Sequence, residues 1–174
     1  MPPVNILLGI TGGIAAYKTP ELVRQLRKRG HAVRCVLTDN AVRLVARDAL
    51  AAVSGAPVAM ELWPDDGHMD HIDLARWAEV VLIAPATANV LAHLRLGLAD
   101  DLLTTLALAF DPARPRFIAP AMNTVMWNQP AVQENLAVLV QRGWCTIGPV
   151  AGELACGEQG VGAMASPEVI ADAI

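Results

Sequence analysis

Short apolar runs alternate with amphipathic segments along nearly the whole chain. The apolar runs predict strands over residues 4–10, 32–37, 58–62, 79–84, 115–119 and 144–148. The amphipathic segments predict helices over residues 17–29, 41–54, 71–78, 87–94, 101–110, 130–143 and 167–174. Strands that are apolar almost throughout, alternating with helices, indicate a parallel sheet covered on both faces. We therefore expect an α/β fold in which a doubly wound parallel sheet forms the middle of a three-layer sandwich.

The ends of the predicted strands are the first candidate site positions, because ligands of doubly wound sheets bind outside the carboxyl ends of the strands. These positions are residues 11–14, 38–40, 85–89 and 120–123. Gly12 and Gly13 follow the first strand and open a helix, so bare backbone can approach a ligand and N–H groups can bind an anion there. A tight turn with no ligand is the alternative.

Two strand ends together suit the phosphate of a mononucleotide. The glycine pair does not complete a G-x-G-x-x-G pattern, and the second strand ends in Thr38 with Asp39 beside it, so a nicotinamide dinucleotide is disfavoured. Thr87 offers a hydroxyl at the start of another helix, although a helix N-cap alone would explain it.

The stretch APAMNTVMWNQP, residues 119–130, places an asparagine among large apolar side chains. Asn123 could hold a carboxylate through its NH₂ group without adding charge, or it could cap a helix. Met122, Met126 and Trp127 are interpreted first as core residues, and they would also suit a wall against a flat aromatic ring.

His71 is the histidine whose position suits proton transfer. It starts a predicted helix after a polar loop, where a side chain can point into a cleft. His31, His68 and His93 are interpreted as ordinary solvated or packed residues.

Cys156 lies in a glycine-rich stretch, residues 152–162, that is predicted to be a mobile loop. A thiol on such a lid could deliver a proton to a substrate, and an inert cysteine is the alternative. Cys35, Cys145 and Cys156 are too far apart for a disulfide framework or a zinc site. We therefore expect no metal and a reducing, cytoplasmic setting.

The composition narrows the class of protein. Hydrophobic residues make up 54% of the 174 residues and charged residues only 17%, so we expect surface that is buried against other subunits. The net charge of −4 and the lack of a basic cluster argue against nucleic-acid binding. No apolar run reaches the length of about 18 residues that predicts a membrane span. We expect one domain over residues 1–174.

Six stretches together resemble the homo-oligomeric flavin-containing cysteine decarboxylases, and most closely the phosphopantothenoylcysteine decarboxylases of coenzyme A biosynthesis. They are residues 9–18 (GITGGIAAYK), 69–74 (MDHIDL), 84–89 (APATAN), 99–103 (ADDLL), 120–127 (PAMNTVMW) and 154–157 (LACG). Each stretch is modest alone, and the order and spacing of all six carry the resemblance.

This resemblance implies an FMN cofactor, a flavodoxin-like or Rossmann-like fold, and trimers that in bacteria often assemble into dodecamers. It implies that His71 is the active-site base, that Asn123 holds the substrate carboxylate and that Cys156 donates a proton. The residues that it places in FMN binding are Gly12, Gly13, Ile14, Thr38, Thr87, Ala88, Asn89 and Met122.

The implied reaction is the oxidative decarboxylation of 4'-phosphopantothenoylcysteine to 4'-phosphopantetheine. Oxidation of the cysteine side chain gives a thioaldehyde, whose C=S group accepts the electrons left when CO₂ departs. Reduced FMN then returns electrons to the enethiol, so that the net redox change is zero. A peptidyl-cysteine decarboxylase, acting on a C-terminal cysteine of a peptide, and a non-catalytic flavin-binding regulatory protein are the alternatives.

Two features depart from the coenzyme A enzymes. Their clamp loop, at about residues 152–165 here, usually continues Gly-x-Gly-Arg-Met, whereas this chain has Ala163 in the place of the arginine. That change leaves open which group the substrate carries at the end away from its carboxylate. Bacterial enzymes also commonly carry a C-terminal synthetase domain, and we expect none within this chain, which stops at Ile174.

Overall fold

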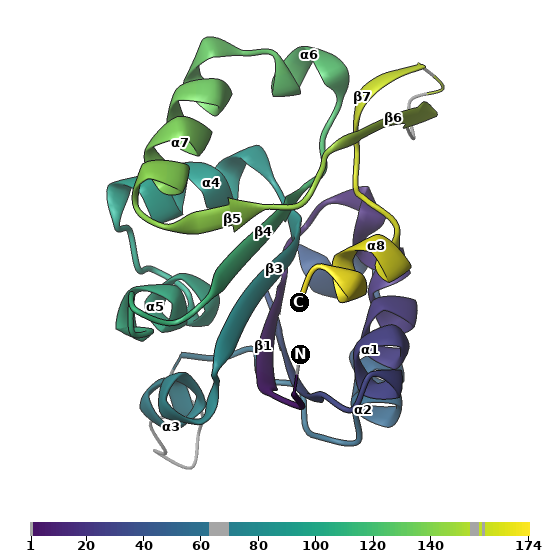
Figure 1. Cartoon of the computed structure of the whole chain (residues 1–174), viewed down its shortest axis with the longest axis vertical. Helices are drawn as coiled ribbons and strands as arrows, with labels where there is room; N and C mark the ends of the chain where they lie inside the picture. The colour runs from purple at the N-terminus through teal and green to yellow at the C-terminus, as the bar shows by residue number, and fades with distance from the viewer. Residues whose placement is uncertain (1, 63–69, 154–156, 158) are drawn as a thin grey trace.

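A parallel sheet of five strands forms the centre of the molecule, as the computed structural model in Figure 1 shows. The structure describes residues 2–62, 70–153, 157 and 159–174. The strands are β1 (Asn5–Ile10), β2 (Ala32–Leu37), β3 (Val80–Ala86), β4 (Arg116–Pro120) and β5 (Trp144–Thr146). Their order, β2-β1-β3-β4-β5, is flavodoxin-like, and the direction of winding reverses between β1 and β3. The predicted doubly wound parallel sheet is confirmed.

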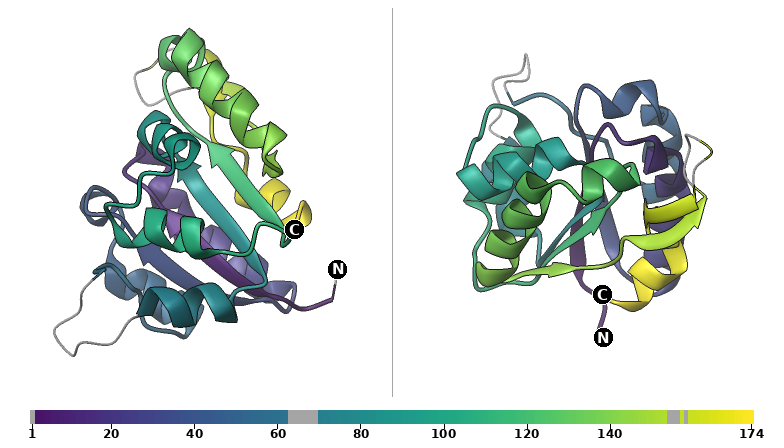
Figure 2. Two further views of the ribbon diagram at one scale, coloured as in Figure 1. Left: turned by 90° about the vertical axis from the view of Figure 1, so that its left-hand side faces the viewer. Right: turned by 90° about the horizontal axis from the view of Figure 1, so that it is seen from above.

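Helices cover both faces of the sheet, which gives the three layers seen in Figures 1 and 2. One face packs against α1 (Thr19–Lys28), α2 (Arg47–Ser54) and α8 (Pro167–Asp172). The other face packs against α3 (Asp70–Trp77), α4 (Ala88–Leu96), α5 (Leu102–Ala109) and α7 (Pro130–Gln141).

Alternation along the strands divides the core between the two faces. Leu8 and Leu82, which are neighbours in the sheet, lie in the core beneath α1, whereas Leu7 and Val81 lie in the core beneath α5. All four side chains are buried, because the sheet is covered on both sides. Apolar residues at every position of these strands therefore have a packing partner.

Two predicted elements differ in the structure. Residues 58–62 do not form a strand, because the chain meets the edge of β2 only at Ala59, in a single bridge to Val36. Residues 41–54 do not form one helix. The segment divides into a short 3-10 helix, η2 (Ala41–Arg43), and α2, because the backbone at Ala46 is extended.

The glycine-rich stretch 152–162 was predicted to be a loop, and much of it is a ribbon instead. β6 (Val150–Glu153) and β7 (Gln159–Ala163) pair antiparallel and form a second sheet. Glycine and alanine give no alternation of apolar and polar side chains, yet their backbones form ladder hydrogen bonds normally. Cys156 lies outside the described residues.

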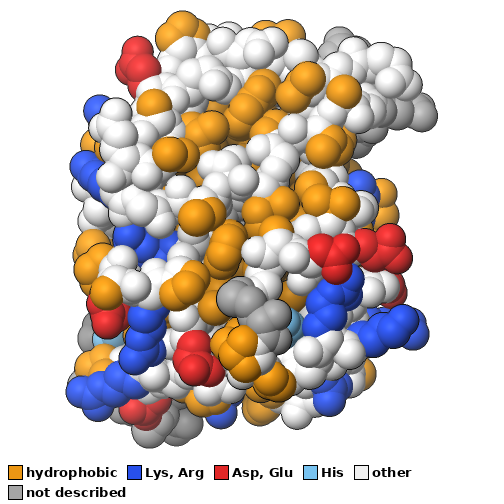
Figure 3. All heavy atoms as spheres, in the orientation of Figure 1, with side chains coloured by type: hydrophobic (Ala, Val, Ile, Leu, Met, Phe, Trp, Pro, Cys, Tyr) orange, Lys and Arg blue, Asp and Glu red, His pale blue; other side chains and the backbone are white. Residues whose placement is uncertain are grey.

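Apolar side chains are frequent on the surface. Figure 3 shows many of them over the upper part of one face, with charged side chains more common toward the lower part. Exposed large apolar residues include Ile14, Tyr17, Leu96, Leu98, Val125 and Met126. Within the described ranges, no helix has the length and apolarity needed to cross a membrane.

Candidate functional site

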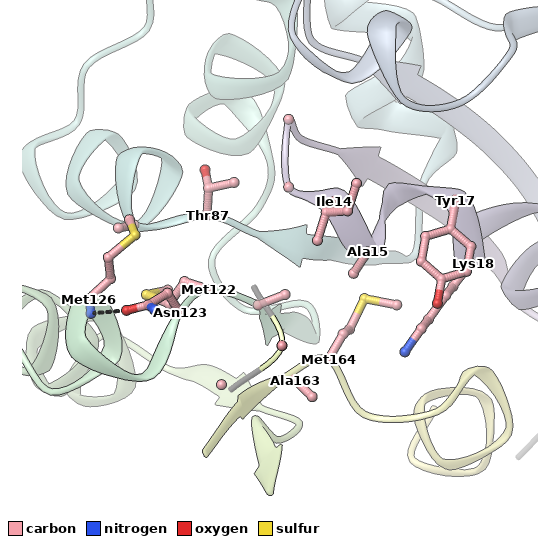
Figure 4. Close-up of a pocket in the computed structure, with 16 residues that line it drawn as sticks. Ile14, Ala15, Tyr17, Lys18, Thr87, Met122, Asn123, Met126, Ala163 and Met164 are labelled. Carbon is pink, nitrogen blue, oxygen red and sulfur yellow. Dashed lines mark hydrogen bonds between the residues drawn. The ribbon is translucent and has the colours of Figure 1, made fainter. Parts of the chain in front are cut away.

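A pocket of about 670 Å³ lies where the carboxyl ends of β1, β3 and β4 meet β7. Figure 4 shows side chains from these elements pointing toward one another. A volume of this size is typical of small-molecule sites. The described residues that line it are Gly12, Gly13, Ile14, Ala15, Tyr17, Lys18, Thr87, Ala88, Ala121, Met122, Asn123, Met126, Gly157, Gly162, Ala163 and Met164.

The first wall of the pocket is the turn after β1 together with the end of β3. Thr11, which is buried, donates its hydroxyl to the carbonyl of Pro85 at 2.6 Å, and its oxygen accepts from the N–H of Thr87 at 3.3 Å. These two bonds hold the strand ends at the winding reversal together. A ligand in the pocket therefore meets a rigid surface on this side.

Gly12 leaves no room for a side chain toward its neighbour Asn40. A Cβ atom on Gly12 would lie 2.4 Å from the Cβ of Asn40, which is far closer than real contacts allow. Gly12 and Gly13 also line the pocket, so a ligand contacts their backbone directly. Glycine is thus required by packing on one side and permits close approach on the other.

Thr87 both caps a helix and lines the pocket. Its hydroxyl oxygen accepts from the N–H of Val90 at 3.3 Å, which confirms the N-cap interpretation for α4. The cap holds the side chain at the pocket wall, so the two interpretations of this residue are compatible.

The second wall is formed by α6 (Thr124–Trp127) and β7. Asn123 caps α6: its Oδ1 accepts from the N–H groups of Val125 at 2.7 Å and Met126 at 3.2 Å. The cap sets the orientation of the amide, since the oxygen is directed at the helix (Figure 4). The NH₂ group is therefore the end of Asn123 that can serve a ligand acceptor in the pocket.

Glycines of β7 allow the ribbon to pack on the loop that carries Asn123. The N–H of Met122 donates to the carbonyl of Gly162 at 3.0 Å, and a Cβ on Gly162 would lie 2.2 Å from the Met122 carbonyl oxygen. A Cβ on Gly160 would lie 2.3 Å from Oγ1 of Thr124. Only glycine permits this backbone approach, so the ribbon determines where the second wall stands.

Most of the predicted site residues come together in this pocket, and some do not. Gly12, Gly13, Ile14, Thr87, Ala88, Met122 and Asn123 all line it. Thr38 and Asn89 are absent from the lining. Thr38 instead lies beside the end of β1, where its N–H donates to the carbonyl of Ile10 at 3.1 Å, and Asn89 is in the first turn of α4.

The two large residues near Asn123 have different surroundings. Met126 is 47% exposed and lines the pocket, so its interpretation as a core residue was wrong. Trp127 is half-buried and packs against the core beneath α5, in agreement with that interpretation.

His71 lies on α3 and is not among the residues that line the pocket. Trp77, the last residue of α3, accepts a hydrogen bond from Nδ2 of Asn5, the first residue of β1, so the helix ends near the amino edge of the sheet (Figure 1). Nδ1 of His71 is buried and has no hydrogen-bond partner among the described residues. Within one chain, therefore, His71 and Asn123 are not brought together in the pocket.

Several lining residues were not predicted. Tyr17 and Lys18 stand at the end of the short 3-10 helix η1 (Ile14–Lys18), and Ala163 and Met164 come from β7 and the residue after it. Tyr17 is 63% exposed. An aromatic ring and a cation within six residues of a glycine turn were the signal for the first pair, but both were predicted only as part of the helix over residues 17–29.

The remaining described cysteines are not part of this site. Cys35 lies in the core, where burial raises the pKa of its thiol to about 12, so it is not a thiolate near neutral pH. Cys145 is exposed on β5. No cluster of three or more His, Cys, Asp or Glu side chains that could hold a metal ion occurs in the described part of the chain.

Comparison with known proteins identifies similar chains over the full length. The model of the Flavoprotein family matches residues 1–174. The coenzyme A biosynthesis bifunctional protein CoaBC of Vibrio cholerae is 50% identical over 165 residues, which are 94% of this chain and 41% of that protein. The chain thus spans about two fifths of the length of the curated relatives it matches.

Solved structures match the whole architecture. A mutant of PPC decarboxylase in complex with pantothenoylaminoethenethiol is 34% identical, with a TM-score of 0.90 over 98% of this chain and 96% of that one. The FMN-binding protein AtHal3 is 36% identical, with a TM-score of 0.85 over 98% of this chain and 94% of that one.

Proposed function

The chain belongs to the Flavoprotein family, and from this premise we propose that it binds FMN and decarboxylates 4'-phosphopantothenoylcysteine to 4'-phosphopantetheine. The observation that carries the proposal is the pocket, which joins a glycine turn at the winding reversal to an oriented asparagine amide on the opposite wall. Similarity to CoaBC, to PPC decarboxylase and to an FMN-binding protein supports the same substrate and cofactor.

The residues of the pocket fit a flavin mononucleotide. Gly12 and Gly13 expose backbone, and the Thr87 hydroxyl stands at the start of α4, as phosphate binding requires. Ile14, Met122 and Met126 offer apolar and polarisable surface of the kind that contacts a flat ring. When bound, FMN supplies a two-electron acceptor that is regenerated within one turnover. Among the other predicted FMN contacts, Ala88 lines the pocket, whereas Thr38 and Asn89 would act from outside the lining.

Asn123 is proposed to hold the carboxylate that is lost. Its Oδ1 is occupied by the backbone of α6, so its NH₂ group donates to the substrate. A neutral donor orients the carboxylate without the strong stabilisation of its charge that an arginine would give. This difference favours the reaction, because the charge leaves the carboxyl group as CO₂ forms.

His71 is proposed to act as the base from a neighbouring copy of the chain. It lies outside the pocket lining of its own chain, so it reaches a substrate only across a subunit contact. Exposed apolar residues near the pocket, Ile14 and Val125 among them, support assembly into a homotrimer or dodecamer. Cys156 is the proposed proton donor in the final reduction and lies outside the described residues. We place the reaction in the cytoplasm.

The test is incubation of the FMN-loaded protein with phosphopantothenoylcysteine and, separately, with a peptide that ends in cysteine. Mass spectrometry measures the loss of CO₂ from each substrate. We expect phosphopantothenoylcysteine to lose CO₂ and the peptide to lose little. Decarboxylation of the peptide alone would favour the peptidyl-cysteine alternative, and flavin binding with no decarboxylation of either would favour a regulatory protein. A His71→Asn variant should keep FMN and lose decarboxylation; if the variant retains the normal rate, His71 is not the base.

A further inference from the structure

Lys18 supplies the positive charge of the pocket. It is half-buried at the junction of η1 and α1, and it is the only charged side chain among the described residues that line the pocket. Figure 4 shows Lys18 and Tyr17 at one end of the pocket and Asn123 at the other, with Met164 between them. The two polar ends are therefore separated by apolar surface.

Among the described residues, Lys18 makes no capping bond and no ion pair. It is the N-cap residue of α1 and makes no side-chain capping bond, and a cation at that end of a helix opposes the helix dipole. No carboxylate of the described residues lies within ion-pair distance of its amine. Glu21, in the first turn of α1, contacts Gln25 and Arg24 instead. The lysine therefore does not stabilise the fold by any of these interactions.

The two residues that follow Lys18 offer no free backbone N–H group to an anion. The N–H of Thr19, the C-cap of η1, donates to the carbonyl of Ala16, and Pro20 has no N–H. The amine of Lys18 lies 5.8 Å from the centroid of the Tyr17 ring. A compact ammonium on a flexible stem can move from that ring to a phosphate without breaking an ion pair.

We propose that Lys18 binds the phosphate group at the far end of the substrate and so makes this site selective for a phosphorylated cysteine conjugate. The inference rests on the proposed function, which puts the carboxylate of the same substrate at Asn123. A phosphate could also come from the flavin. The flavin phosphate is assigned to the glycine turn and Thr87. Figure 4 shows Thr87 apart from Lys18.

The first test measures binding without turnover. The dissociation constants of 4'-phosphopantetheine and pantetheine are measured by calorimetry on the FMN-loaded protein. We expect Lys18→Gln to raise the dissociation constant of 4'-phosphopantetheine at least about tenfold, since one charge-assisted contact is lost. The dissociation constant of pantetheine should not change. Lys28→Gln is the matched control, because Lys28 is an exposed lysine in the last turn of α1. An unchanged ratio of the two constants in Lys18→Gln would overturn the proposal.

A second variant separates charge from shape. Lys18→Arg keeps the cation, so it should retain most of the preference for the phosphorylated ligand, whereas an equal loss in Lys18→Arg and Lys18→Gln would contradict a role for charge. The preference should also decrease with rising salt in the wild-type protein, because Lys18 is only half-buried.

A third measurement assigns the phosphate. The apoprotein is titrated with FMN and with riboflavin, and flavin fluorescence is followed. We expect Lys18→Gln to bind both flavins as the wild type does, whereas a selective loss of FMN affinity would assign Lys18 to the cofactor and overturn the proposal. Decarboxylation is followed in parallel. If the protein shows no turnover but still prefers the phosphorylated ligand in a Lys18-dependent way, the proposed function is refuted and the phosphate site is retained.

Discussion

The two walls of the pocket are built from different parts of the chain and are held in different ways. The first wall is the turn after β1 and the end of β3, two neighbouring strands of the central sheet joined through the hydroxyl of Thr11. The second wall is α6, whose position depends on a ribbon about 40 residues further along the chain, packed on it through Gly160 and Gly162. The first wall follows from the sheet itself, whereas the second needs an added element.

Because they are held differently, the two walls suit different ligands. A wall fixed by the sheet suits a cofactor that stays bound, because the core strands that carry it are among the most stable parts of a fold. A wall that rests on a two-stranded ribbon suits a substrate that enters and leaves. Variants in the two walls should therefore separate flavin binding from substrate turnover.

The largest effect is expected for Asn123→Asp. Aspartate caps α6 as well as asparagine does, so the midpoint of thermal unfolding should change little. Its charge would repel the substrate carboxylate, so kcat/KM should decrease about a hundredfold or more. Asn128→Asp is the control, since it adds the same charge at an exposed position at the end of α6. Full activity in Asn123→Asp would exclude Asn123 as the carboxylate ligand.

Gly162→Ala should separate the walls most directly. The added Cβ would lie 2.2 Å from the Met122 carbonyl oxygen, so the ribbon must shift away from α6. We expect about a tenfold loss in kcat/KM and a loss of about 1–3 kcal/mol in the free energy of unfolding, with FMN affinity preserved. Gly152→Ala is the control on the same ribbon, because among the described residues its Cβ would meet the Cβ of Ala163 at an ordinary 3.7 Å. If Gly162→Ala lost FMN affinity by the same factor as kcat/KM, the two walls would not be independent.

Thr11→Val tests the first wall. It removes the 2.6 Å hydrogen bond to Pro85 and leaves a buried carbonyl without that donor, so the free energy of unfolding should fall by about 1–3 kcal/mol. FMN affinity should decrease together with the stability. Urea unfolding measures the stability, and flavin titration measures the affinity. Thr38→Val is the comparison, because the Thr38 hydroxyl lies 3.5 Å from the Ile10 carbonyl and contributes a weaker bond. Equal destabilisation by both variants would argue against a special role for Thr11.

The smallest effect is expected far from both walls, at His31. Burial, with positive charge nearby, lowers the pKa of His31, and its Nδ1 accepts from the N–H of Val4 at 3.3 Å. The unfolded chain therefore binds the proton more readily, so the free energy of unfolding should decrease as the pH falls below about 6.5.

His31→Gln should reduce this dependence, as measured by urea unfolding at several pH values from 7.5 downward. The dissociation constant of FMN at the pocket should not change in step with it. A steeper pH dependence in the variant would contradict this assignment.

The five strands of the central sheet were the reliable part of the prediction from sequence. The run over residues 32–37 is apolar except for Arg34, and the structure has β2 at those residues. Thr87 was predicted correctly as a cap because capping depends on its nearest neighbours. Residues 58–62 failed because a strand needs a partner along its length, and the chain offers one only at Ala59.

What the sequence by itself determined is therefore local: the alternating strands and helices, the glycine turn, and the asparagine at the start of α6. Only the tertiary structure decided that Gly162 meets Met122, that Lys18 faces the same pocket as Asn123, and that His71 stays outside it. These relations join residues from distant parts of the chain. They depend on backbone contacts and on the packing of helices against the sheet, neither of which leaves a periodic signal in the sequence.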